Sequence, residues 1–130
     1  MEGISVPISP GELLDKITIL RIKSARIEDP AKLANVRREL TLLEQVWRQT
    51  VAEAAELAGE EAALERINAL LWDIEDRIRE CEARQRFDPA FIELARSIYL
   101  NNDERAAIKQ RINRKLNSAI IEEKAYSPYR

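Results

Sequence analysis

The side chains that could carry chemistry in this sequence are carboxylates, lysines, arginines and tyrosines. The 130 residues include no histidine and one cysteine, which excludes Ser-His and Cys-His nucleophile pairs and HExxH zinc sites. Cys81 continues an apolar helix line through Ile74 and Ile78, so we interpret it as a small buried residue rather than a nucleophile. We therefore predict no catalytic residue, no metal site and no cofactor, and we favour a protein that is not an enzyme.

One carboxylate occupies a position where a charge is costly. Asp15 falls in line with Ile19 and Ile22 on a predicted helix, where an unpaired carboxylate would lose its hydration. We expect an ion pair with an arginine of another helix, and keep open the alternative of a polar pocket that holds a small anion between helices. The candidate ligand-binding residues for that pocket are Asp15, Lys16, Arg37, Arg38, Glu75, Asp76, Arg105 and Lys109.

A large aromatic residue also lies off the apolar seam of its helix. Trp72 points away from the line that contains Leu71 and Ile78, so another part of the structure must cover it. The first or the last helix of the chain covers Trp72, or a second copy does, or the ring stacks on a ligand. We mark Trp72 as an interface residue and expect a homodimer or a contact with another protein.

Two pairs of acidic residues suggest a metal site. Glu53-x-x-Glu56 and Asp73-x-x-Asp76 loosely resemble the paired acidic motifs of all-α nucleotide pyrophosphohydrolases, which hold magnesium above a diphosphate. Asp73 and Asp76, however, both face away from the seam that their helix would share with the preceding one. In a chain with 23 acidic residues such spacing arises easily, so we assign no metal site.

Charge and hydropathy also limit the classes of partner that the protein is expected to bind. A net charge of −2 lacks the basic footprint of a nucleic-acid-binding protein, and no aromatic residues interleave with the basic stretch around Lys109 and Arg111. No segment approaches the roughly 20 apolar residues of a membrane span, and the N-terminus lacks the order of a signal peptide. We expect a soluble cytoplasmic protein that binds neither nucleic acid nor membrane.

Start and stop signals divide the chain into five predicted helices. Ser9-Pro10, Asp29-Pro30 and Asp88-Pro89 each place a side-chain acceptor at the N-cap and a proline at the first helical position. Gly59 marks a break, and residues 101–103 mark a turn. The predicted elements are an extended arm over 1–9 that lies on the body, helices over 10–28, 30–58, 60–86, 89–100 and 103–124, and a tail over 125–130.

The strongest pattern is a pair of apolar lines within residues 33–85. Apolar residues from Leu33 to Ala54 recur at the spacing of one helix face, and those from Leu64 to Cys81 repeat that spacing. Because a short connection makes the two helices antiparallel, we predict a long helical hairpin at the centre of an all-α, up-down bundle. We expect residues 1–130 to form one domain.

Several segments resemble a known family. ISPGELLDKITIL at 8–20, LWDIEDRIRECE at 71–82 and NDERAAIKQRIN at 102–113 resemble segments of short bacterial proteins known only as a domain of unknown function. This resemblance covers nearly the whole chain and implies bacterial origin, but no activity and no catalytic residue. LLDKITILRIKSARI at 13–27 is similar to the first helix of all-helical chorismate mutases, which hold a dicarboxylate with arginines and lysines, but the later helices supply no matching set.

Helical bundles host unrelated functions, so the fold alone does not select a function. We predict a non-catalytic protein-interaction or scaffold module. The alternative is an enzyme or sensor that binds a small anion between the first, third and fifth predicted helices.

Overall fold

The computed structural model describes residues 1–52 and 54–129, which form four α-helices and one short 3-10 helix. The elements are α1 (Pro10–Arg26), α2 (Pro30–Thr50), η1 (Ala54–Leu57), α3 (Ala58–Ala83) and α4 (Pro89–Lys115). Of the described residues 74% are helical and none forms a strand, so the predicted all-α class is confirmed. No helix in these two ranges is long and apolar enough to span a bilayer.

The predicted starts of three helices are confirmed. The side chains of Ser9, Asp29 and Asp88 each accept a hydrogen bond from the backbone N–H three residues later, at 3.2, 2.9 and 3.2 Å. Each cap is followed by a proline in the first turn, which loses nothing there because that N–H has no partner within the helix. These caps set the points at which α1, α2 and α4 begin.

The predicted break at residues 101–103 is wrong, because α4 continues through them. Asn101 turns its side-chain amide back onto the helix and donates a hydrogen bond to the carbonyl of Ser97 at 2.8 Å. An asparagine in a helix costs at most about 0.7 kcal/mol relative to alanine. Packing of α4 along α3 outweighs that preference, so the fourth and fifth predicted helices are one helix.

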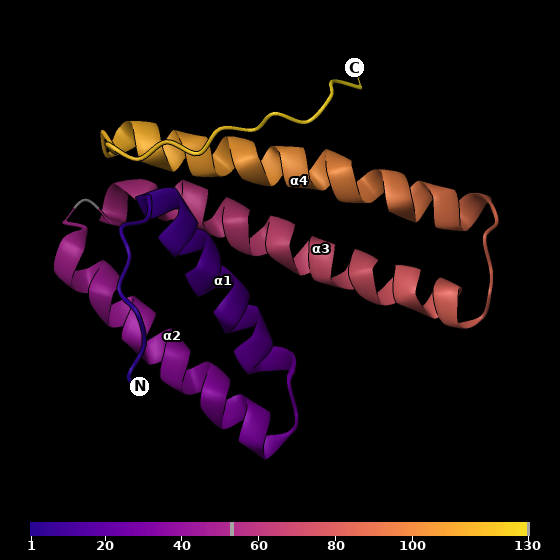
Figure 1. Cartoon of the computed structure of the whole chain (residues 1–130), viewed down its shortest axis with the longest axis horizontal. Coiled ribbons are helices and arrows are strands. Elements are labelled where there is room, and N and C mark those ends of the chain that lie inside the picture. The colour runs from indigo at the N-terminus through magenta and orange to yellow at the C-terminus, as the bar shows by residue number, and fades with distance from the viewer. Residues whose placement is uncertain (53, 130) are drawn as a thin grey trace.

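α2, predicted over 30–58, ends at Thr50, and α3 and α4 also end earlier than predicted. A residue with a left-handed backbone follows α3 and α4. Asn117 has a φ of 51° and Gln85 a φ of 53°. After α4, the N–H of Ser118 donates to the carbonyl of Asn113 at 2.9 Å, which is the bond of a Schellman motif. The chain reverses at this point, and the segment 117–129 runs back along α4 (Figure 1).

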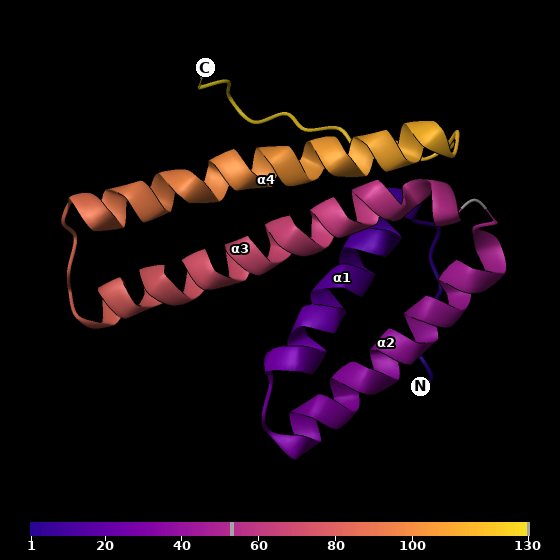
Figure 2. The ribbon, with the colours of Figure 1, turned by 180° about the vertical axis from the view of Figure 1, so that it is seen from behind.

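The predicted hairpin between the second and third helices is not found. α2 packs on α1, α3 packs on α4, and α1 also contacts both α3 and α4. Figures 1 and 2 show α2 diverging from α3 after the connection between them. α1 lies between α2 and the α3/α4 pair and packs against both.

The hydrophobic core lies where α1 crosses the other helices. Leu14, Ile17, Leu57, Leu64 and Ile112 are buried at its centre. The ends of α3 and α4 that the loop 84–88 joins extend beyond α1 and α2 (Figures 1 and 2). We call this part of the structure, residues 70–102, the distal hairpin.

Residues 1–9 and 117–129 lie outside the helices. In the N-terminal arm the apolar side chains of Ile4 and Val6 are 79% and 65% exposed. The C-terminal tail begins at residue 117 instead of 125. It is held against α4, where the ring of Tyr129 stacks edge-on against Tyr99 with centroids 4.8 Å apart.

Candidate functional site

Asp15 is the centre of a buried polar site between α1, α3 and α4. Its carboxylate is 1% exposed and accepts two hydrogen bonds from the guanidinium of Arg105, one of them from Nε at 2.8 Å. The side-chain amide of Asn68 donates a third, at 2.9 Å. The predicted ion pair between Asp15 and an arginine of another helix is therefore confirmed, and the paired geometry is the one that makes burial of a carboxylate tolerable.

Asn68 extends this site into a polar connection between α1 and α3. Its amide also donates to the hydroxyl of Thr18 at 3.0 Å, and that hydroxyl donates to the backbone carbonyl of Asp15 at 2.8 Å. Among the described residues, no buried side-chain nitrogen or oxygen lacks a hydrogen-bond partner. The site is satisfied by the protein's own groups.

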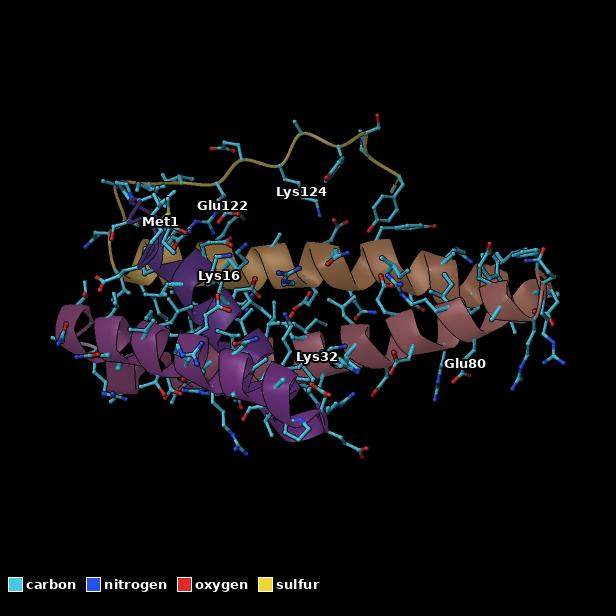
Figure 3. The ribbon with its side chains drawn as sticks, turned by 60° about the horizontal axis from the view of Figure 1, so that its bottom comes forward. Met1, Lys16, Lys32, Glu80, Glu122 and Lys124 are labelled. Atoms are coloured by element: carbon cyan, nitrogen blue, oxygen red, sulfur yellow. The ribbon has the colours of Figure 1, made fainter. Side chains whose placement is uncertain are left out.

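Lys109 joins the same site to the C-terminal tail. Its ammonium lies 2.6 Å from a carboxylate oxygen of Glu12, 3.1 Å from one of Glu122 and 4.0 Å from one of Asp15. Figure 3 shows Glu122 on the tail that runs along α4. We call Glu12, Asp15, Arg105, Lys109 and Glu122 the charge cluster. It holds three carboxylates and two cations, so its formal charge is negative.

The charge cluster shifts the ionisation of its members. Burial alone would raise the pKa of the Glu12 carboxyl, but the hydrogen bond from Lys109 and the positive charges of Lys109 and Lys16 lower the pKa from 4.5 to about 2. The pKa of Arg105 is raised above its usual value, first by its hydrogen bonds to Asp15. Burial would lower the pKa of Lys109, but its hydrogen bonds to Glu12 and Glu122 raise it. All three groups are held in their charged forms.

The low pKa of Glu12 predicts an acid-sensitive contribution to stability. A carboxyl whose pKa is lower in the folded state stabilises the fold above its unfolded pKa of 4.5. That stability is lost as the pH falls from 4.5 towards 2. Over this range we expect the unfolding free energy of Glu12→Gln to fall by about 1 kcal/mol less than that of the unsubstituted protein, allowing for screening by water. Urea unfolding at a series of pH values measures it, and parallel curves for the two proteins would contradict the assignment.

Gly11 brings α1 into direct contact with α4 next to the charge cluster. Its backbone N–H donates a hydrogen bond of 2.7 Å to the buried side chain of Asn113. A Cβ atom on Gly11 would lie 2.5 Å from the carbonyl oxygen of Lys109 and 2.9 Å from Asn113 Oδ1. No side chain fits between these backbones, so glycine is required here for close approach.

The structure brings together only some of the predicted ligand-binding residues. Asp15, Arg105 and Lys109 meet, and Lys16 lies at their edge, exposed and 3.6 Å from Glu12. The other predicted residues lie on exposed helix surfaces away from the charge cluster. They are Arg37 and Arg38 on α2, and Glu75 and Asp76 on α3.

Sequence reasoning missed Glu12, Asn68 and Glu122 as members or neighbours of the cluster. Glu12 gave one usable signal, because it stands in the first turn of α1 on the same side as Asp15 and Lys16. Asn68 and Glu122 gave no such signal. Asn68 interrupts an otherwise apolar face, and Glu122 lies in a segment predicted to be helical.

Trp72 is half-buried and partly covered from within the chain. The guanidinium carbon of Arg26, at the end of α1, lies 5.8 Å from the centre of the Trp72 ring, and the same guanidinium lies 2.6 Å from Asp73. A cation over the face of an indole is a favourable contact. Of the acidic pairs, Asp73 is thus engaged by an arginine, Asp76 is exposed, and Glu53 lies outside the described residues.

A second surface feature is a groove between α3 and α4 in the distal hairpin, with a volume of about 600 Å³. We call it the distal groove. Its apolar floor is formed by Leu70, Ile74, Cys81, Ala90 and Leu94. Cys81, predicted to be buried, is half-buried there. The charged rim of the groove is formed by Arg77, Glu80, Arg84, Arg86 and Glu93.

The distal groove opens on the side of α3 opposite to α1. Asn68, which meets α1, and Arg77, which lines the groove, are nine residues apart, and at 3.6 residues per turn this places them about half a turn from each other. Leu70 on the groove floor is 45% exposed. Within the described residues, none of the five rim side chains forms an ion pair. The groove is thus an apolar strip beside charges that form no ion pair in the part of the chain that the structure describes.

Comparison with known proteins gives a family and no function. A family model described as "Family of unknown function (DUF6165)" matches residues 4–129. No curated protein and no solved structure shows significant similarity to the chain.

Proposed function

The chain belongs to this family of unknown function, and we propose that it is a protein-interaction module that binds a helix of a polypeptide partner in the distal groove. Membership confirms the resemblance of the sequence to an uncharacterised family. It brings no activity with it, so the proposal rests on the geometry of the chain.

The observation that carries the proposal is the uncovered apolar floor of the distal groove beside charges that have no partner in the described chain. Two antiparallel helices present parallel ridges, and a third helix packs into the groove between them through apolar residues at three-four spacing. Leu70 and Leu94, one from each helix, would supply apolar contacts. The rim charges would set the orientation of the partner, as charges around an apolar centre do in protein interfaces.

The alternative of a small-anion site at the charge cluster has less support. An anion needs donors and positive charge that the protein has not already used. Arg105 is engaged by Asp15, and Lys109 by Glu12 and Glu122. An additional anion would meet three carboxylates at close range. We therefore interpret the charge cluster as a structural connection between α1, α4 and the tail.

Photocrosslinking from the groove floor tests the proposal. We expect benzoylphenylalanine in place of Leu70 to form a covalent protein adduct in cells of the source organism, because the partner helix would lie against that side chain. The matched control replaces Leu42 on α2, which is 55% exposed against 45% for Leu70 and lies outside the groove. Denaturing electrophoresis of illuminated cells, followed by mass spectrometry, measures the adducts.

Comparing crosslinking at positions 70 and 42 distinguishes specific binding from nonspecific hydrophobic contact. An adduct at position 70 and none at position 42 would support the module. Equal labelling at both positions, or no adduct at position 70, would refute binding in the distal groove. The adduct mass also identifies the partner class, because a second copy adds 15.0 kDa and any other partner adds a different mass.

A further inference from the structure

We infer that the occupant of the distal groove is a second copy of this chain, packed face to face through a two-fold axis that runs across α3 and α4. This inference rests on the proposed function and names its partner. In such a dimer the two distal hairpins form an antiparallel four-helix bundle, and the same surface serves on both copies.

Charge complementarity favours a second copy over an unrelated helix. Along the groove edge the charges of α3 and of its C-cap alternate as Arg77, Glu80 and Arg84, and none is in an ion pair within the described residues. If the two-fold axis passes between positions 77 and 80, Arg77 of each copy lies opposite Glu80 of the other. In this register the segment from Arg77 to Glu80 is complementary to itself, because each of these two charges meets the opposite charge on the other copy.

The shape of the chain leaves room for this packing. By helix phase, α1 lies on the opposite side of α3 from the groove. The distal hairpin extends beyond α1 and α2 (Figures 1 and 2). Figure 3 places Glu80 on this extended part of α3. A second hairpin can therefore reach the groove without displacing any helix of the first copy.

The size of the groove sets the expected strength of the dimer. From Leu70 to Arg84 the helix advances about 21 Å, and two adjacent helices are about 20 Å wide. A face of these dimensions is smaller than the roughly 800 Å² that each partner buries in a standard stable interface. We therefore expect a reversible dimer that dissociates on dilution rather than an obligate one.

Charge reversal tests the pairing directly. Arg77 and Glu80 are both exposed, so their variants should fold normally. We expect Arg77→Glu and Glu80→Arg each to raise the dimer dissociation constant by about tenfold or more, because each places like charges opposite one another. The double variant, which exchanges the two charges, should restore dimerisation. Sedimentation equilibrium from micromolar to millimolar protein measures all four proteins.

Cys81 provides an independent readout, because it is the single cysteine of the chain and lines the groove. In the proposed register the two copies of Cys81 are offset by five residues along the helices, which is about 7.5 Å at a rise of 1.5 Å per residue. With helix axes about 8–10 Å apart, their Cα atoms lie about 12 Å from each other. This separation is too long for a disulfide. We therefore expect a short bismaleimide, but not an oxidant, to link the copies. The control is Leu42→Cys combined with Cys81→Ala, which should not cross-link.

Each outcome bears on the dimer separately from the proposed function. Restoration by the charge exchange, together with bismaleimide linkage at Cys81, supports the two-fold pairing. A monomer throughout the concentration range overturns it, as does a dimer that neither charge reversal weakens. In either case an adduct of another mass at position 70 would still support an interaction module. No adduct there would remove the proposed function as well.

Discussion

Replacing Arg105 with alanine is expected to destabilise the fold by about 3–5 kcal/mol, the usual cost of stranding one member of a buried ion pair. Asp15 is 1% exposed and receives two of its hydrogen bonds from this guanidinium. Without Arg105 the carboxylate keeps Asn68, while Lys109 lies 4.0 Å away. Neither replaces a bidentate cation. Urea unfolding at neutral pH, followed by far-ultraviolet circular dichroism, measures the loss.

Asp15→Asn should cost less than Arg105→Ala, about 1–3 kcal/mol, because the guanidinium left behind is not fully enclosed. The side chain of Arg105 is 29% exposed, so it can recover hydration that a buried carboxylate cannot. Arg96→Ala, on the exposed surface of the same helix, serves as the control and should change stability by less than about 0.5 kcal/mol. If Arg105→Ala behaved like Arg96→Ala, the charge cluster would not be a structural connection. Anion binding would then need to be tested there.

The same substitution at two glycines is expected to have opposite effects. Gly11→Ala would place a Cβ 2.5 Å from the backbone carbonyl of Lys109, so α1 must move away from α4 and Asn113 must lose its bond to the Gly11 N–H. We expect a loss of about 2–4 kcal/mol from overpacking and the stranded amide. At Gly59, in the first turn of α3, a Cβ meets nothing within 4 Å. Gly59→Ala should stabilise the fold by about 0.5 kcal/mol through helix propensity alone.

Thermal and urea unfolding of both alanine variants tests the contact between α1 and α4. Because alanine favours helices at either position, a loss at position 11 can only come from the close approach of the two backbones. Two equal gains would show that α1 does not lie against Lys109. Gly11→Ser is a second test, because the larger serine side chain should destabilise the fold more than alanine at the same position.

Local features of the fold followed from the sequence because their causes are local. The caps at Ser9, Asp29 and Asp88 need only the side chain and the three residues after it, and all three helix starts are as predicted. Asp15 was identified from helix phase, since a carboxylate in line with isoleucines requires a partner. That partner, Arg105, is 90 residues away. It could be named only as one of the candidate charges.

Pairing of the helices could not be predicted in the same way. The apolar periodicity around Trp47 in α2 and around Leu64 in α3 shows which face of each helix is buried. It does not show whether α1, α3 or α4 covers that face. We assigned α2 and α3 to each other because they are neighbours in the chain, whereas α1 lies between them. The turn assigned to residues 101–103 failed for a related reason, since a weak local preference was outweighed by packing along α3.

The distal groove could not be predicted from the sequence, because it depends on the pairing of α3 with α4. Leu70 and Leu94 line one groove only when α3 and α4 lie side by side. Trp72, which we marked as an interface residue, is covered in part by Arg26 of α1. Its position off the seam correctly indicated that another element must approach α3, and α1 accounts for that approach.

The separation of Asp15 and Arg105 along the chain has a consequence for the order of folding. The hairpins α1/α2 and α3/α4 each close a short loop, whereas the contact between Asp15 and Arg105 closes 90 residues. Short loops lose less conformational entropy and form faster. We therefore expect each hairpin to form while both charges are still hydrated. The ion pair is then desolvated late, when α1 docks onto the other hairpin. The rate-limiting step of folding would thus be the docking of two preformed halves.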